Sequence, residues 1–165
     1  MNAKQYIHHL DLSPHPEGGF YRQTYRSSEY IPLNVLPPRF TGVRPICTAI
    51  FYLLERSDFS SFHRIKSDEC WHFYAGNTLH IHVIEEDGNY NRIKLGSLIE
   101  QGETFQFVVP AGAWFAAEPA PGTSFTLTGC TVAPGFDFND FEMGHKATLI
   151  SLFPQHGAIL DRLCR

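Results

Sequence analysis

The stretch H-R-I-K-S-D-E-C-W-H-F-Y-A-G, residues 63–76, decides the fold and raises the functional question. It contains a His, a Glu six residues later and a Gly seven residues after the Glu. Apolar segments typical of β-strands flank it at Ile46–Leu54 and Leu79–Glu85. A His and a carboxylate held together among such strands can bind a metal, move a proton or fix a polar ligand.

Further strands follow on both sides, separated by glycine and proline turns. Besides the two flanking strands, the pattern predicts strands at Phe20–Arg26, Tyr90–Leu95, Thr104–Val109, Ala113–Ala117 and Thr123–Val132. Residues 2–10 predict a short helix, the segments 145–153 and 157–163 predict C-terminal helical elements, and residues 27–45 predict a long loop. The order of elements indicates an all-β sandwich or barrel that forms a single domain over residues 1–165.

Amino-acid composition and charge argue against two classes of partner, nucleic acids and membranes. The 165 residues are 43% hydrophobic and 14% aromatic, as expected for a globular chain. With 13 Lys and Arg against 17 Asp and Glu, the net charge is −4 and there is no basic tract, so we expect no nucleic-acid partner. No apolar run approaches the roughly 20 residues that cross a bilayer, so we expect no membrane partner. The four cysteines form no C-x-x-C pair, which is typical of reduced thiols in a cytoplasmic protein.

The spacing of residues 63–76 resembles that of cupins. Many cupins carry G-x5-H-x-H-x3–4-E-x6-G and, further on, G-x5-P-x-G-x2-H-x3-N. His63, Glu69 and Gly76 fit the first pattern, and Pro110-Ala111-Gly112 fits the second. This resemblance implies a double-stranded β-helix, the cupin jelly-roll barrel.

Four longer strings resemble one cupin subfamily in particular. They are Pro14–Tyr21, His63–His72, Val109–Trp114 and Val132–Glu142, and they resemble an uncharacterised subfamily that is grouped with the dTDP-sugar epimerase-like jelly rolls. The resemblance implies a homodimer and a polar pocket in the barrel that takes a small-molecule ligand. It implies no particular reaction.

Two of the four cupin metal ligands are replaced by apolar residues. Ile65 stands at the second His position, Phe115 stands at the last His position, and Pro119 replaces the Asn. A lone His and Glu are too few ligands for tight binding of a divalent ion. We therefore expect no cofactor and no fully coordinated divalent ion in the barrel, with a weakly held divalent metal left as an alternative.

The predicted catalytic pair is His63 with Glu69. If Glu69 faces the barrel interior, as its motif position implies, strand alternation brings Trp71 to the same face. His63 and Ile65 would face inward from the preceding strand, within a few ångströms of Glu69. A carboxylate at that distance would orient the imidazole as a general base or acid. The alternative is a buried hydrogen-bonded pair inherited from a metal-binding ancestor.

Other residues are weaker candidates. Asp137, in the string F-D-F-N-D-F-E, is a third candidate acid or base. The predicted ligand-binding residues are Trp71, Trp114 and Phe115 as aromatic surfaces, Ile65 as an apolar wall, and Glu17 and Arg22 beside a glycine turn.

Several of these residues also have structural interpretations. Glu17 and Arg22 could equally form an ion pair, and His15 is better explained as part of the turn. His80 and His82 form the best local alternative for a metal, although an H-x-H pair of this kind more often faces solvent.

Three functions of different classes remain open at the level of sequence. The first is a metal-independent enzyme that transfers protons on a small polar or sugar-like molecule, as an isomerase or epimerase does. The second is a cupin that binds or senses a small molecule without changing it. The third is a metal-dependent cupin enzyme with a reduced ligand set, which the replacements at Ile65 and Phe115 disfavour.

Overall fold

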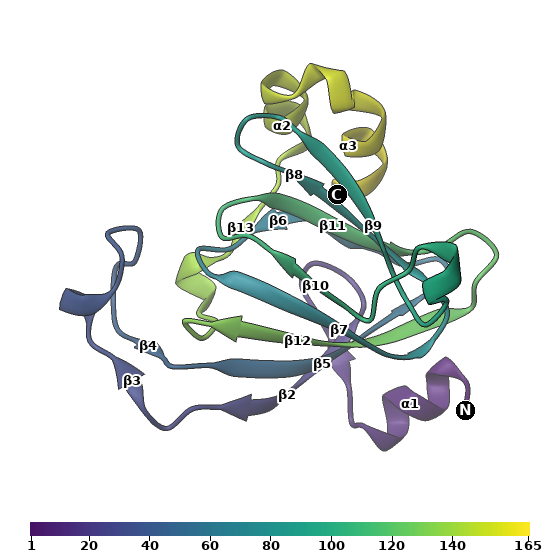
Figure 1. The fold of residues 1–165 in the computed structure, drawn as a ribbon, viewed down its shortest axis with the longest axis horizontal. Coiled ribbons are helices and arrows are strands. Elements are labelled where there is room, and N and C mark those ends of the chain that lie inside the picture. Colours follow the sequence, from purple (N-terminus) through teal and green to yellow (C-terminus); the bar gives the residue numbers. More distant parts are fainter.

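Two antiparallel sheets face each other and enclose the core of the molecule (Figure 1). The computed structural model describes residues 1–165. The first sheet has the strand order β1 (Ser13–Pro14), β2 (Phe20–Arg26), β5 (Thr48–Glu55), β12 (Phe125–Ala133), β7 (Asp68–Gly76) and β10 (Gln106–Val109). The second has the order β13 (Glu142–Met143), β6 (Ser60–Arg64), β11 (Trp114–Pro119), β8 (Leu79–Ile84) and β9 (Tyr90–Leu95).

Alternation along the strands builds the core between the sheets. Tyr52 and Trp71 from the first sheet meet Ile81 and Phe115 from the second, and all four are almost fully buried. Because successive strand residues point to opposite faces, the intervening residues lie on the outside of each sheet. The jelly-roll fold expected from the sequence is confirmed.

Helices pack against part of the outer face of each sheet. Helix α1 (Ala3–His9) contributes Ala3 to an apolar cluster on the first sheet. Helices α2 (Lys146–Leu152) and α3 (Gly157–Leu163) pack together on the second sheet, at the top of Figure 1. Short 3-10 turns occur at Leu33–Val35, Ile99–Gln101, Phe138–Asp140 and Pro154–His156. The predicted terminal helical segments are therefore confirmed, with Pro154 opening one of these turns.

The long segment predicted as a loop contains a small sheet of its own. Strands β3 (Tyr30–Ile31) and β4 (Arg44–Pro45) pair with each other at one end of the molecule. In β4, Arg44 is 3% exposed and donates two hydrogen bonds, of 2.5 and 2.6 Å, to the carboxylate of Asp140. Lys66 Nζ lies 3.6 Å from the same carboxylate. This buried pair fastens the Pro-rich segment to residues 136–141.

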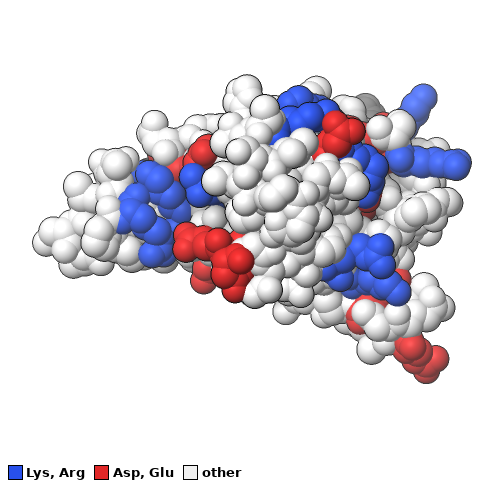
Figure 2. Space-filling view, turned by 90° about the horizontal axis from the view of Figure 1, so that it is seen from above, with Lys and Arg blue, Asp and Glu red and all other residues white.

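Charge on the exterior is mixed. On the face shown in Figure 2, Lys and Arg side chains lie in small groups beside groups of Asp and Glu, separated by broad uncharged areas. No helix is both long and apolar enough to cross a bilayer.

Candidate functional site

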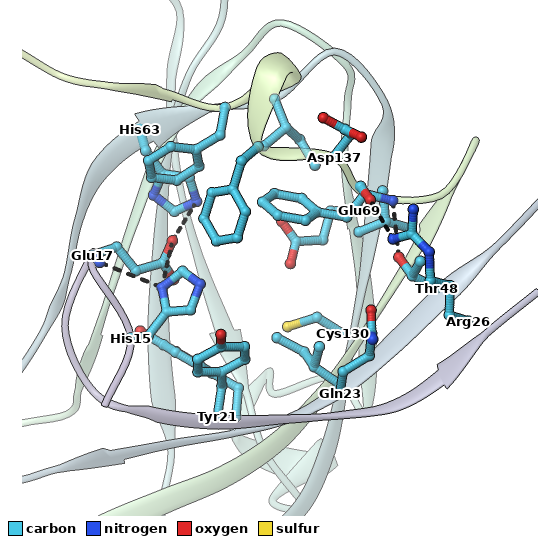
Figure 3. Close-up of a pocket in the computed structure, with 17 residues that line it drawn as sticks. His15, Glu17, Tyr21, Gln23, Arg26, Thr48, His63, Glu69, Cys130 and Asp137 are labelled. Atoms are coloured by element: carbon cyan, nitrogen blue, oxygen red, sulfur yellow. Dashed lines mark hydrogen bonds and ion pairs between the residues drawn. The ribbon is translucent and has the colours of Figure 1, made fainter. Parts of the chain in front are cut away.

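A cavity of about 350 Å³ opens between the inner face of the first sheet and the segment 136–141. Figure 3 shows its lining side chains, with His15, Glu17 and His63 on one side and Glu69, Cys130 and Arg26 on the other. Aromatic rings form much of the remaining wall. The lining residues are His15, Glu17, Tyr21, Gln23, Arg26, Thr48, Ile50, Tyr52, His63, Ile65, Glu69, Cys130, Val132, Phe136, Asp137, Phe138 and Phe141.

A tight glycine turn delivers two of the polar side chains. Gly18 and Gly19 have φ of +117° and +70°, where a residue with a Cβ is strained, and a Cβ on Gly18 would also meet the Phe59 carbonyl oxygen. The hydroxyl of Tyr52 donates a 2.7 Å hydrogen bond to the Gly18 carbonyl oxygen and so fixes the turn to β5. This geometry directs the side chains of His15 and Glu17 into the barrel.

His63 has both ring nitrogens engaged. Its Nδ1 lies 2.7 Å from the carbonyl oxygen of Ser61, and because a carbonyl only accepts, Nδ1 carries a hydrogen. Its Nε2 lies 3.1 Å from Glu17 Oε2. One proton is therefore shared across the His63–Glu17 contact, either as imidazolium with carboxylate or as imidazole with carboxylic acid.

Glu17 is held from several sides. Ser60 Oγ donates a 3.0 Å hydrogen bond to Glu17 Oε1, and His15 Nδ1 lies 3.6 Å from Glu17 Oε2. The Nδ1 atom of His15 also accepts a 3.4 Å hydrogen bond from the Glu17 backbone N–H. Burial lowers the pKa of His15, with His63 adding to the effect and Glu17 opposing it, so the neutral ring is favoured. Glu17 is thus a positioned carboxyl group that lines the cavity.

Glu69 differs from Glu17 in protonation. Burial, with the nearby Glu17 adding to its effect and the Cys130 thiol opposing it, raises the pKa of Glu69 to about 8. At pH 7 Glu69 is therefore mostly a neutral carboxylic acid, which can donate a hydrogen bond. Burial and the proximity of Glu69 raise the pKa of Cys130 as well, so its thiol stays protonated.

A pH dependence of stability follows from Glu69. Its pKa rises from 4.5 to about 8 on folding, so the folded state holds an extra proton between these values. Stability should therefore fall as the pH rises through this window, by about 1.4 kcal/mol per pH unit at most. Urea unfolding from pH 5 to pH 8, compared between the wild type and Glu69→Gln, separates this slope from the opposite contribution of His15, whose pKa burial lowers.

Glu69→Gln should flatten the slope because the amide does not titrate. Glu103→Gln, at a buried carboxyl group outside the cavity, is the matched control and should keep it. An unchanged slope in Glu69→Gln would show that another group sets the pH dependence.

The structure gathers five of the predicted site residues around the cavity and leaves four outside. Those that line it are Glu17, His63, Ile65, Glu69 and Asp137. Trp71 and Phe115 lie in the core between the sheets, and Phe115 packs on the His63 ring at 4.1 Å between centroids. Trp114 faces the C-terminal helices, with the Arg64 guanidinium over its ring. Arg22 points outward and donates to the Leu10 carbonyl oxygen.

Two expectations about neighbours need correction. His63 forms its pair with Glu17 and has no hydrogen bond or ion pair with Glu69, because the turn at Gly18 and Gly19 inserts Glu17 beside it. His82 does not face solvent: it is 2% exposed, since Tyr90 and Glu118 cover it.

Several residues that line the cavity were not predicted from the sequence. Tyr21 and Gln23 point inward from β2, and Thr48 and Ile50 point inward from β5. Period-two alternation within these two strands was the signal that could have found them. Arg26 follows a register shift between Gln23 and Tyr25, which the alternation alone does not reveal.

The barrel does not offer the usual cupin metal ligands. Ile65 presents an apolar side chain at the cavity wall, and Phe115 fills core space beside His63. The remaining imidazole nitrogen of His63 is bonded to Glu17. A group of three His and carboxylate donors that all lie within 4.8 Å of one another occurs instead at His80, His82 and Glu118, outside the barrel.

A jelly roll of two antiparallel sheets with a polar cavity between them is the architecture of cupins. Oxalate decarboxylase from Bacillus subtilis shares the fold at 13% identity with a TM-score of 0.56, over 93% of this chain and 37% of that one. Residues 4–144 match the family model described as Cupin superfamily (DUF985), and the chain belongs to this family.

Three relatives match this chain at higher identity. A hypothetical protein from Leishmania major has a TM-score of 0.91 and 35% identity, over 99% of both chains. A protein from Shewanella oneidensis has a TM-score of 0.88 and 38% identity, over 100% of this chain and 98% of that one. An uncharacterized protein of Saccharomyces cerevisiae is 30% identical over 148 residues, which cover 84% of this chain and 73% of the relative.

Proposed function

We propose that the barrel binds a small polar or sugar-like molecule and transfers a proton on it without a metal, as an isomerase or epimerase does. The observation that carries the proposal is a pair of buried carboxyl groups that line one cavity in different surroundings. Glu17 shares its proton with His63, whereas Glu69 is held neutral by burial. Carboxyl groups that differ in this way are suited to act as base and acid on one substrate.

The roles differ from those expected from the sequence. Because both nitrogens of His63 are engaged, we assign contact with the substrate to the Glu17 carboxyl group, which lines the cavity, and His63 orients it and stabilises its charge. Glu17 as carboxylate takes a proton from a carbon next to a carbonyl. The C–H electron pair moves toward the carbonyl oxygen, to which the Glu69 O–H donates a hydrogen bond or its proton. Protonation of the carbon on its opposite face completes an epimerisation, and a proton given up by Glu69 returns to it from the enol oxygen as the carbonyl re-forms.

The remaining wall favours a ligand with an apolar face and a charged or hydroxyl-rich end. Phe136, Phe138 and Phe141 supply flat surfaces for such a face. Arg26 is the one guanidinium on the wall, and it is also bonded to the Phe136 carbonyl oxygen. Asp137 lines the same side and remains a third candidate acid or base.

Proton exchange with solvent tests the proposal while the substrate is still unidentified. The purified protein is incubated with a small-molecule cell extract in D₂O, and mass spectrometry follows each compound. We expect at least one compound to gain deuterium at carbon with the wild type and not with Glu17→Gln. A compound that binds but neither exchanges nor changes would instead identify a binding or sensing cupin.

We also propose that the protein is a homodimer, as its resemblance to other cupins suggested. Tyr25, Tyr74 and Val108 lie on the outside of the first sheet and are 53%, 52% and 48% exposed. Pairing this face with a second copy would remove it from water.

Sedimentation at micromolar concentration should give a dimer. Tyr74→Glu should give a monomer because it would bury an unpaired charge, whereas Leu152→Glu, at another exposed apolar side chain, should not. A monomeric wild type would contradict the proposal.

A further inference from the structure

A second cluster of chemically capable side chains lies outside the barrel, on the outer face of the second sheet. His80 and His82 are two residues apart on β8 and therefore point to the same side. Glu118 of β11 is the register partner of His80. The three side chains come from two adjacent strands within the second sheet, so their backbone positions are fixed by pairing.

The donor atoms of these side chains converge. One ligand atom from each of His80, His82 and Glu118 lies within 4.8 Å of the other two. Around a tetrahedral zinc ion, with bonds of about 2.0–2.2 Å, ligand atoms are about 3.4 Å apart. His82 Nε2 and Glu118 Oε1 are already 3.1 Å apart, so the main adjustment falls on His80, which has no hydrogen-bond partner in the protein.

A histidine that binds a metal normally has its second ring nitrogen hydrogen-bonded to another residue, and His82 has such a partner. His82 is 2% exposed, and its Nδ1 lies 2.8 Å from the hydroxyl of Tyr90. Such a contact on the far nitrogen fixes the ring and leaves Nε2 directed at a metal. The donor set of two imidazoles and one carboxylate, with a position left open, suits zinc and similar first-row ions better than magnesium or calcium.

From this geometry we propose that His80, His82 and Glu118 form a binding site for a divalent transition metal of the zinc class. The site is separate from the barrel cavity, which none of the three residues lines. Arg162 of α3 would compete with the metal for Glu118, because its guanidinium already forms an ion pair with the second carboxylate oxygen of Glu118. Metal binding would shift or release this contact, and so would link occupancy to the packing of the C-terminal helix.

Calorimetric titration with ZnCl₂ tests the site, and Co²⁺ serves as a visible-light probe of tetrahedral coordination. The wild type should bind one Zn²⁺ per chain. His80→Ala should weaken binding at least tenfold, taking about 10-fold as the lower limit for disturbing a ligand shell. Because His80 is only partly buried, this variant should stay folded, which circular dichroism verifies.

A second variant moves affinity the other way. Arg162→Gln should tighten binding, because it frees Glu118 and removes a nearby positive charge; the Arg162 side chain is 52% exposed, so the fold should tolerate the change. His72→Ala, at a strand histidine on the other sheet, is the control and should bind as the wild type does. No Zn²⁺ binding by the wild type, equal binding by His80→Ala, or loss of binding in His63→Ala would each overturn the proposal.

Discussion

Glu17→Gln should lower the rate of proton exchange in the barrel by about 10²–10⁴-fold, the usual loss when a positioned acid or base is removed. The amide keeps the shape of the side chain but cannot take a proton from a carbon. The rate is measured as deuterium incorporation into the compound identified in D₂O. Glu103→Gln is the matched control, because Glu103 is 8% exposed, close to the 6% of Glu17, and lies outside the cavity.

His63→Ala should also reduce turnover, and circular dichroism checks that the variant is folded, because it leaves Glu17 buried without its imidazole partner. Its second readout is the pH profile, which should change because Glu17 loses the imidazole that shares its proton. Glu69→Gln should weaken turnover and alter the opposite limb of the profile, because the neutral acid becomes an amide that cannot give up a proton. Full activity in Glu17→Gln would exclude Glu17 as the base, and Asp137 would be tested next.

Arg44→Ala should destabilise the protein by about 3–5 kcal/mol, the range found when one partner of a buried ion pair is removed. Asp140 would be left as a buried carboxylate with only Lys66 nearby, at 3.6 Å. The segment that carries Phe138 and Phe141 over the cavity would lose its attachment to β4, so ligand binding should weaken too. Urea denaturation gives the change in unfolding free energy.

Two comparisons make this result interpretable. Lys146→Ala removes a partner from the exposed Lys146–Asp161 pair, where the side chains are 43% and 73% exposed, and should cost at most about 1 kcal/mol. Replacing both buried partners, as Arg44→Met with Asp140→Leu, should recover most of the loss because no charge remains unpaired. A loss below about 1 kcal/mol in Arg44→Ala would show that water reaches the pair.

The strands and their faces could be predicted from the sequence because they depend on local alternation. Residues 20–26 and 90–95 were predicted as strands with the bounds that β2 and β9 have. The bounds of β5 and β12 shifted by a residue or two, since register with neighbouring strands decides where pairing begins. The cupin pattern of His63, Glu69 and Gly76, with Ile65 and Phe115 replacing ligands, was also visible in the chain itself.

The partners of the site residues were decided only by the tertiary structure. The cupin motif positions correctly directed His63 and Glu69 into the barrel, but they contain no information on which carboxylate reaches the imidazole. The turn at Gly18 determines which carboxylate it is. This turn packs against Tyr52 and Phe59, and it therefore brings Glu17 to His63 from a distant part of the chain. Contacts across sheets depend on how whole elements pack, and so the acid–base pair of this cupin had to be found in three dimensions.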